Sequence, residues 1–273
     1  MRVMTWNILN GGVDGGNSSR LDRILSVITD LAPEVVVLQE AKGFDVDGCR
    51  RMHEVENALD MRGFLGVGHT DQPVLVLIRR PHPVVDCFID SASFHHALVR
   101  LRVRLGDGST MRVLGAHLCP DSALTRLIEA QRLANYAYVD EDVVLMGDLN
   151  SVDHHGDYRH LVAELPAHYR ARHVLPAESA QLDTRVTATL EAAGFVDLAY
   201  WFGSGADRPT APTELPSTGA EFRGMRVDYI YASLPLASRV TNVGVVVNDA
   251  TAVASDHYPV VADFGLPPEK ARS

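Results

Sequence analysis

Several segments of the sequence pass between apolar runs and polar residues that could do chemistry. The apolar runs are short, as is typical of buried strands. In α/β sheets, side chains at strand ends converge on a common crevice, so these polar residues are candidates for a single site. Taken singly, each is more often a turn former or a helix cap, and the argument rests on their combination. The residues concerned are Asn7, Glu40, His117, Asp148, Asn150, Asp256 and His257.

The combination supplies what the hydrolysis of a phosphate ester requires. A hard cation must neutralise charge on the phosphoryl oxygens, and Mg²⁺ typically takes one or two carboxylates and keeps several waters. Glu40 is the best candidate ligand, with Asn7 beside it. A carboxylate must also orient and deprotonate the attacking water, while a neutral amide fixes the geometry. Asp148 and Asn150, two apart on an extended segment, point to the same side and fit these two roles.

A cationic donor is needed where charge builds on the phosphoryl group or the leaving oxygen. His257 can be that donor if a carboxylate fixes its tautomer and favours its protonated form. Asp228 begins the apolar segment Asp-Tyr-Ile-Tyr and is the candidate partner. We therefore expect a histidine and aspartate dyad.

Six motifs, in order between residues 5 and 260, resemble those of the endonuclease/exonuclease/phosphatase superfamily, which includes DNase I and the exonuclease III class of apurinic endonucleases. The resemblance implies an α/β (α+β) fold of the DNase I type, a four-layered sandwich in which two sheets lie face to face with helices outside. It also implies a metal-dependent phosphoric ester hydrolase. The motifs are Thr5-Trp-Asn7, Leu38-Gln-Glu40, His117-Leu118, Gly147-Asp-Leu-Asn150, Arg226-Val-Asp-Tyr-Ile230 and Ser255-Asp-His-Tyr-Pro-Val260.

The resemblance implies roles position by position, and these agree with the chemistry argued above. Glu40 matches the metal carboxylate, and Asn7 and Asp256 match further groups of a site for Mg²⁺, for which Mn²⁺ can substitute. Asp148 and Asn150 match the pair that positions water, and Asp228 and His257 match the dyad. His117 lies where members of the family carry a residue that contacts phosphate.

The substrate is left open by the sequence. The tryptophan that often precedes the Arg-x-Asp-Tyr motif in apurinic endonucleases is replaced by Gly224-Met225, which puts abasic-site repair in doubt. A net charge of -10 argues against unaided binding to long polyanions. The favoured hypothesis is a nuclease-like phosphodiesterase. The alternatives are an enzyme for a small metabolite, nucleotide conjugate or phospholipid head group, and a binding module without catalysis.

Residues 152–184 form a polar segment, and we expect residues 154–185 to overhang the site and contact the substrate. Arg170 and Arg172, together with Arg226, are candidate substrate-binding residues, although such arginines can equally pair with carboxylates on the surface. His154 and His155 could add a second metal or phosphate contact. The more favoured interpretation is that they are solvated loop histidines, because adjacent residues lack a spacing that converges them on one ion.

The elements that must position these residues follow from periodicity. Residues 3–6 and 35–38 are predicted strands with a helix between them, and 98–105 and 111–116 are predicted to pair as a hairpin around the Asp107-Gly108 turn. We expect one domain over residues 1–266 and a polar tail over 267–273. No apolar run reaches the roughly 20 residues of a membrane span. An odd number of cysteines and a strand in place of a signal peptide indicate a cytoplasmic protein, with no obligate protein partner evident.

Overall fold

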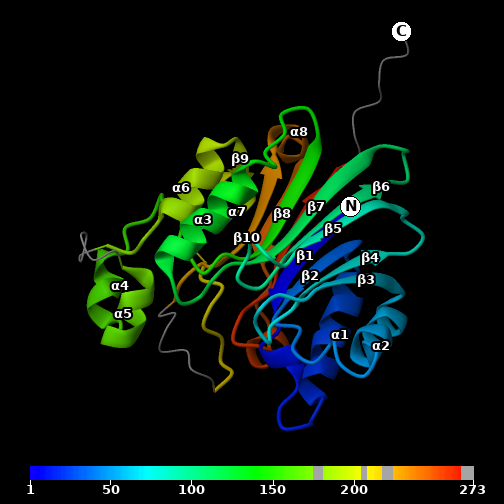
Figure 1. The fold of residues 1–273 in the computed structure, drawn as a ribbon, viewed down its shortest axis with the longest axis horizontal. Helices are drawn as coiled ribbons and strands as arrows, with labels where there is room; N and C mark the ends of the chain where they lie inside the picture. Colours follow the sequence, from blue (N-terminus) through cyan, green and yellow to red (C-terminus); the bar gives the residue numbers. More distant parts are fainter. Residues whose placement is uncertain (175–180, 204–207, 217–223, 266–273) are drawn as a thin grey trace.

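The computed structural model describes residues 1–174, 181–203, 208–216 and 224–265 of the chain. Two six-stranded sheets lie face to face in it, and helices cover their outer faces (Figure 1). This is the predicted four-layered α/β sandwich. The division into one domain and a tail stays a prediction, because residues 266–273 lie outside the described residues.

The first sheet joins the beginning of the chain to its last described strand. Its order is β11-β12-β1-β2-β4-β3, with β1 parallel to β2 and the other neighbours antiparallel. The run of valines in β2 is buried along its whole length, as expected of a strand covered on both faces. The strands are β1 (Arg2–Asn7), β2 (Val35–Gln39), β3 (Met61–Gly66), β4 (Val74–Arg79), β11 (Val240–Val245) and β12 (Val260–Phe264).

The second sheet is built from the middle of the chain, in the order β5-β6-β7-β8-β10-β9. The predicted hairpin is present, with Leu98 opposite Ala116 and Arg104 opposite Thr110. Parallel pairing of β7 with β8 brings His117 beside Asp148. The strands are β5 (Val84–Asp90), β6 (Leu98–Arg104), β7 (Thr110–His117), β8 (Asp142–Asp148), β9 (Phe195–Asp197) and β10 (Asp228–Ser233).

The main core lies between the two sheets and consists mainly of valine, isoleucine, leucine and methionine. The sheets approach closely where Gly115 of β7 faces β4 and β2. A Cβ atom at this position would lie 2.5 Å from a methyl group of Val76 and 3.0 Å from one of Val37. The absent side chain therefore allows the sheets to pack tightly just behind the strand ends that carry the candidate catalytic residues.

The helices form the outer layers. The amphipathic helices α1 (Ser19–Leu31) and α2 (Arg50–Leu59) bury one face each against the first sheet. On the other side, α3 (Ala123–Ala134) and α6 (Arg185–Ala192) cover the second sheet, as Figure 1 shows. The side chain of Ser122 accepts a hydrogen bond from the Thr125 amide, so the predicted cap begins α3. Shorter helices are η1 (Asn10–Gly12), α4 (Arg159–Glu164), α5 (Ala167–His173), α7 (Leu198–Phe202), α8 (Leu234–Ala237) and η2 (Thr251–Val253).

Candidate active site

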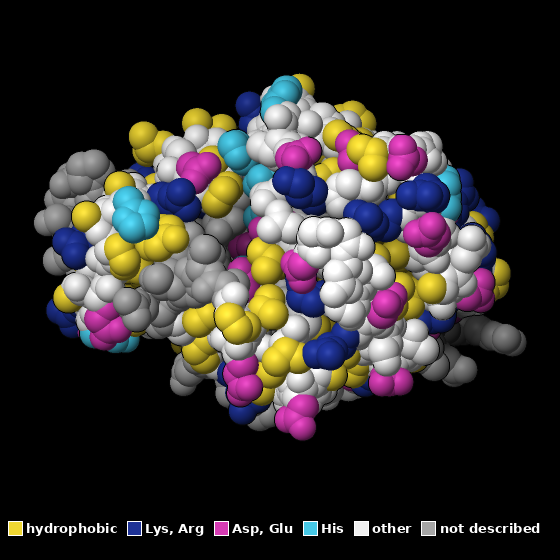
Figure 2. Space-filling model, turned by 90° about the horizontal axis from the view of Figure 1, so that it is seen from below, with side chains coloured by type: hydrophobic (Ala, Val, Ile, Leu, Met, Phe, Trp, Pro, Cys, Tyr) yellow, Lys and Arg dark blue, Asp and Glu magenta, His cyan; other side chains and the backbone are white. Residues whose placement is uncertain are grey.

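The candidate catalytic residues lie at one end of the sandwich and come from both sheets. Asn7, Glu40 and the pair Asp256 and His257 follow or precede strands of the first sheet, whereas His117, Asp148 and Asp228 belong to strands of the second. Figure 2 views the molecule from this end, where the surface is hollowed and acidic and histidine side chains lie in and around the hollow. The sequence prediction that these strand ends converge is thus met.

Asn7 connects the two sheets through its side-chain amide. Its Nδ2 donates to Oε1 of Glu40 at 3.3 Å and to Oδ2 of Asp148 at 3.1 Å. Its Oδ1 accepts from the backbone amide of Leu9 at 3.1 Å, which fixes the amide plane. Asn7 therefore fixes the position of Glu40, the candidate metal ligand, relative to Asp148, the candidate base.

Glu40 stands directly after β2 with a left-handed backbone, at φ 58°. Such a conformation is costly for a residue with a Cβ atom and needs support from its surroundings. The support comes from two backbone amides, of which Asn10 donates to Oε2 at 3.0 Å and Gly11 donates to the backbone carbonyl at 2.7 Å. Burial raises the pKa of Glu40, and the nearby charge of Asp256 adds to the rise.

Asp148 ends β8 and is almost completely buried. The amide of Asn150 donates to its Oδ1 at 2.8 Å, and Asn150 in turn donates from Nδ2 to the carbonyl of Leu118 at 3.0 Å. Burial, followed by the charge of Asp228, raises the pKa of Asp148 above its ordinary value. Gly147 is required here because a Cβ atom would lie 1.9 Å from the carbonyl oxygen of Ala116.

The predicted dyad is present. Nδ1 of His257 lies 2.7 Å from Oδ2 of Asp228, and its Nε2 lies 3.9 Å from Oδ2 of Asp148. Burial alone would lower the pKa of His257, but the charge and hydrogen bond of Asp228 and the charge of Asp148 raise it well above the ordinary value. The imidazole is therefore a cation held between two carboxylates.

His117 approaches the same carboxylate oxygen of Asp148 as His257 does, with its Nε2 3.6 Å from Oδ2. Burial and the neighbouring histidines lower its pKa, so His117 is neutral beside the cationic His257. Its ring stacks on that of His96, with centroids 4.1 Å apart. The sequence gives no periodic signal for this contact, which arises because His96, two residues before β6, lies next to the end of β7.

Several buried positioning residues were given no role by the sequence reasoning, although Trp6 and Ser255 lie within two of its motifs. The indole of Trp6 donates to the carbonyl of His257 at 2.8 Å, and Ser255 donates to the carbonyl of Asn7 at 2.7 Å. The guanidinium of Arg20 donates to the carbonyls of Ile8 and Ala254 at 3.1 and 3.0 Å. These bonds tie the loop after β1 to the loop that carries Asp256 and His257. The one sequence signal for these contacts is Arg20, an arginine on the otherwise apolar face of α1.

The three candidate substrate-binding arginines have partners within the protein. Arg226 is buried, where its guanidinium lies 2.8 Å from Asp197 and 3.3 Å from Asp153 and stacks over Tyr229. Arg170 donates to the carbonyl of Leu165 at 3.1 Å. Nη2 of Arg172 lies 3.3 Å from a carboxylate oxygen of Asp121. Their predicted contacts with substrate stay predictions.

The residues around Glu40 fit a hard divalent cation. Glu40 and Asp256 bring two carboxylates close enough for the charge of Asp256 to raise the pKa of Glu40, and carboxylate oxygens are the donors that Mg²⁺ prefers. A separate grouping of Asp148, Asp228 and His257 has ligand atoms within 4.8 Å of one another. Because His257 and Asp228 already bond to each other, we assign that grouping to proton chemistry.

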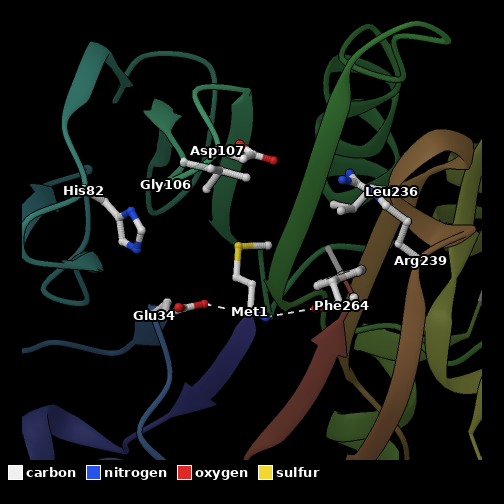
Figure 3. A pocket seen from close by; sticks show the side chains of 10 residues that line it. Met1, Glu34, His82, Gly106, Asp107, Leu236, Arg239 and Phe264 are labelled. Atoms are coloured by element: carbon white, nitrogen blue, oxygen red, sulfur yellow. Dashed lines mark hydrogen bonds and ion pairs between the residues drawn. The ribbon is translucent and has the colours of Figure 1, made fainter. Parts of the chain in front are cut away.

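A pocket at the other end of the sandwich contains none of the candidate catalytic or metal-binding residues. It lies where β1 begins and β12 ends, and its lining includes Met1, Glu34, His82 and Arg239 (Figure 3). The amino group of Met1 donates to the carbonyl of Phe264 at 2.9 Å and lies 3.8 Å from Glu34. We therefore take the end marked by Asp148 as the candidate active site. Within the described ranges, no helix has the length and apolarity needed to cross a bilayer.

Comparison with known proteins identifies the family of the chain. Residues 4–257 match the sequence model of the Endonuclease/Exonuclease/phosphatase family. No curated protein sequence matches the chain. Among solved structures, an endonuclease/exonuclease/phosphatase from Beutenbergia cavernae is 21% identical, with a TM-score of 0.65 over 99% of this chain and 73% of that one.

Two further structures cover the whole fold. An AP endonuclease from Archaeoglobus fulgidus is 18% identical, with a TM-score of 0.67 over 97% of this chain and 100% of that one. A 3' phosphatase from Neisseria, bound to a product DNA hairpin, is 19% identical, with a TM-score of 0.66 over the same shares. At such identities the structures establish the fold, while the family match rests on the sequence itself. The chain belongs to the endonuclease/exonuclease/phosphatase family and is a phosphoric ester hydrolase.

Proposed function

We propose that the protein is a Mg²⁺-dependent phosphodiesterase of the nuclease type, which attacks its substrate with an activated water in line with the leaving oxygen. The proposal rests on one observation, namely that candidate metal ligands and candidate proton-transfer groups lie together at one end of the sandwich. Oxygen donors come from the first sheet, and a buried base comes from the second, beside a dyad that spans both.

Glu40 and Asp256, with Asn7 beside them, would hold the cation. A divalent cation there supplies charge neutralisation at the phosphoryl oxygens. Mn²⁺ can substitute for Mg²⁺, because both accept carboxylate and amide oxygens. The amide of Asn7 keeps Glu40 and Asp148 in register, so that the substrate phosphate and the base face each other.

Asp148 is the group that takes a proton from the attacking water. Its elevated pKa makes it a stronger base than an exposed carboxylate, as general base catalysis near neutrality requires. The Asn150 amide that bonds Oδ1 leaves Oδ2 turned towards Asn7, His117 and His257. Asn150 thereby orients the carboxylate without adding negative charge.

His257 meets the negative charge that develops on the phosphoryl group or the leaving oxygen. Asp228 holds Nδ1 and so directs Nε2 towards the site, and it keeps the ring cationic despite burial. The neutral His117, also beside Asp148, can contact the phosphate without competing for the proton.

A small phosphodiester is the second candidate substrate, and two observations favour it. The net charge of -10 opposes binding to a long polyanion. The arginines proposed to read a substrate already have internal partners, namely Asp197 and Asp153 for Arg226 and Asp121 for Arg172. Nucleic acid remains the first candidate because the AP endonuclease and the 3' phosphatase share the fold.

We further propose that the protein works in the cytoplasm without an obligate protein partner. The three cysteines, Cys49, Cys87 and Cys119, are free, as expected of a reducing compartment. Measuring the protein's distribution between cell fractions tests the compartment. A secreted or membrane-bound pool would contradict it.

A substrate screen tests the activity. Purified protein is assayed with Mg²⁺, Mn²⁺ or EDTA on single- and double-stranded DNA, RNA, 3'-phosphorylated DNA ends, and small diesters and monoesters. We expect metal-dependent cleavage of a diester. Turnover of monoesters alone would contradict the diester assignment. If the folded protein hydrolyses none of these substrates with metal present, a binding module without catalysis is favoured.

A further inference from the structure

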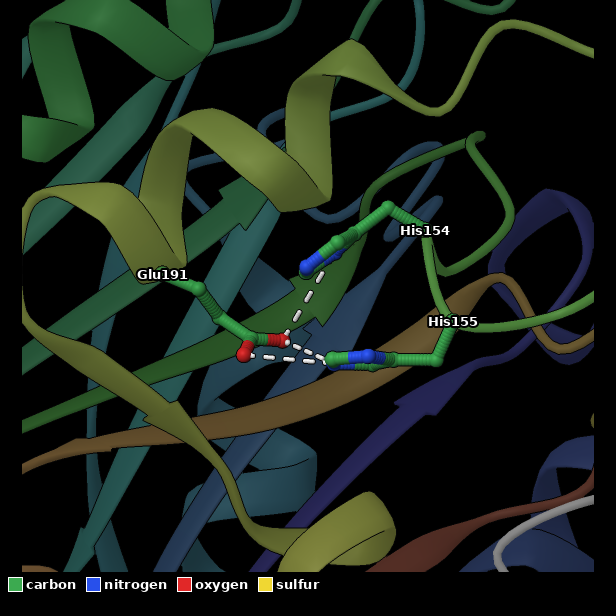
Figure 4. Close-up of side chains that lie close together, drawn as sticks. All are labelled: His154, His155 and Glu191. Carbon is green, nitrogen blue, oxygen red and sulfur yellow. Dashed lines mark hydrogen bonds and ion pairs between the residues drawn. The ribbon is translucent and has the colours of Figure 1, made fainter.

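Two adjacent histidines and a glutamate form a cluster outside the catalytic set. His154 and His155 lie on the loop that leaves β8, and Glu191 lies near the end of α6. Figure 4 shows both imidazole rings turned towards the carboxylate of Glu191. One ligand atom from each residue lies within 4.8 Å of the others. Adjacent histidines were not expected to face one ion. In the structure, both rings face Glu191, which belongs to a different element.

The distances between the histidine nitrogens and the Glu191 carboxylate are also close to those between donors around a small tetrahedral cation. Nε2 of His155 lies 3.0 and 3.2 Å from the two carboxylate oxygens of Glu191, and Nδ1 of His154 lies 3.8 Å from Oε1. Donors bound to zinc at about 2.0–2.2 Å in a tetrahedron are roughly 3.3–3.5 Å apart. The two His to Glu separations, 3.0 and 3.8 Å, bracket that value.

Two further observations indicate that a ligand is needed. Nδ1 of His154 is shielded from solvent and has no hydrogen-bond partner among the described residues, so the protein alone leaves it unsatisfied. The ring of His155 is stacked on Tyr200 with centroids 3.6 Å apart and planes at 5°. A stacked imidazole and an unsatisfied one thus face the same carboxylate.

We propose that His154, His155 and Glu191 bind a transition-metal ion of the Zn²⁺ class, with a fourth position open to water. Two imidazoles and one carboxylate are a donor set found in zinc sites, and imidazole does not suit Mg²⁺. The site is therefore chemically distinct from the all-oxygen set around Glu40. It does not depend on the function proposed above.

The ion fastens the loop after β8 to α6. The same loop carries Asp153, which lies 3.3 Å from Arg226 and accepts a hydrogen bond from Tyr158. Metal binding at residues 154 and 155 thus restrains the segment that follows directly on Asp148 and Asn150. Because the ion binds only the folded arrangement, it raises thermal stability as well as occupying a site.

The test measures metal binding directly. Protein stripped with a chelator is titrated with Zn²⁺ by calorimetry in the presence of excess Mg²⁺, and Co²⁺ is added separately to read the tetrahedral absorption of the bound ion. The variants are His155→Phe, which can keep the stack on Tyr200, and Glu191→Gln. Glu40→Gln controls for binding at the catalytic site. His53→Ala removes a His and Glu pair of similar length, 2.6 Å between Nδ1 and the Glu56 carboxylate, which lacks a second histidine.

We expect one Zn²⁺ per chain, a tetrahedral Co²⁺ spectrum and a higher Tm with Zn²⁺. His155→Phe and Glu191→Gln should each weaken Zn²⁺ binding by more than about 100-fold, since even outer partners of metal ligands contribute 10- to 100-fold. Glu40→Gln and His53→Ala should bind as the parent does. Unchanged binding in His155→Phe and Glu191→Gln, or no Zn²⁺ binding by the folded parent, would overturn the proposal. Phosphoesterase activity is not a readout, so failure of the proposed function leaves this test intact.

Discussion

The hydrogen bond of 2.7 Å between Nδ1 of His257 and Oδ2 of Asp228 crosses from one sheet to the other. His257 precedes β12 of the first sheet, and Asp228 begins β10 of the second. The contact between Asn7 and Asp148 crosses in the same direction. The site is therefore assembled only when the two sheets are docked in one register.

The dyad predicts non-additive losses. His257→Ala and Asp228→Asn should each lower kcat by about 10²- to 10⁴-fold, because each removes the oriented cation. The double variant should resemble the worse single variant, since paired catalytic residues act as one unit. Steady-state kinetics on all three variants measures this. Losses that multiply would mean that the two side chains act separately.

Asp148→Asn should remove most of kcat, by about 10²- to 10⁴-fold, because the water loses its base while the side-chain volume is kept. The circular dichroism spectrum should be unchanged. The exposed Asp249→Asn is the matched control and should retain activity. A kcat for Asp148→Asn within a few-fold of the parent would exclude Asp148 as the base.

Hydrolysis should stop in excess EDTA and return with Mg²⁺ or Mn²⁺. Glu40→Gln should raise the Mg²⁺ concentration needed for half-maximal activity by at least about 10-fold, because it removes a charged ligand. Metal titrations of activity measure this, with the exposed Glu54→Gln as control. Full activity of the parent in EDTA would show that the oxygen donors near Glu40 serve another purpose.

His96 makes stability depend on pH. Burial, and to a lesser degree the charge of His95, lowers its pKa from 6.5 to about 3. Its Nδ1 lies 2.5 Å from the hydroxyl of Thr70. The unfolded chain takes up this proton near pH 6.5 and the folded one does not, so the stability that neutral His96 contributes is present above pH 6.5 and is lost as pH falls towards 3. The loss is at most about 1.4 kcal/mol per pH unit.

Urea unfolding between pH 7 and pH 4 measures this dependence. His96→Gln should flatten the fall in unfolding free energy, whereas the exposed His69→Gln should leave it unchanged. If His96→Gln and the parent fall in parallel, His96 is not the group that titrates.

Arg170 and Arg172 should set KM if they clamp a phosphate remote from the bond being cut. The double change to Ala should raise KM and leave kcat nearly intact, since uniform binding is lost. On a polynucleotide, each lost contact should flatten the slope of log affinity against log salt by about 0.7–0.9. On a small diester the salt effect should be slight. The exposed Arg159→Ala is the control. An unchanged KM would leave both arginines as structural partners of Leu165 and Asp121.

The sequence predicts the strands with apolar runs and their polar ends well, because burial on two faces demands such runs. It predicts the partner of His257 because Asp228 opens a strand. The edge strand β5 was not predicted, since most of its residues are exposed and the apolar signal is weak. Contacts between distant segments, such as Arg20 with the carbonyl of Ala254 or His96 with His117, depend on how elements dock and leave no local pattern. The approach of Glu191 to His154 and His155 is another such contact between distant segments.

The order of the elements along the chain divides the candidate catalytic residues into two groups. The connection between β4 and β5 separates a stretch that carries Asn7 and Glu40 from one that carries His117, Asp148, Asp228 and His257. We expect polypeptides made on either side of this connection each to be inert, and we expect activity to return when the two reassociate. The fold is thus a natural scaffold for a split enzyme whose signal reports that its two pieces have met.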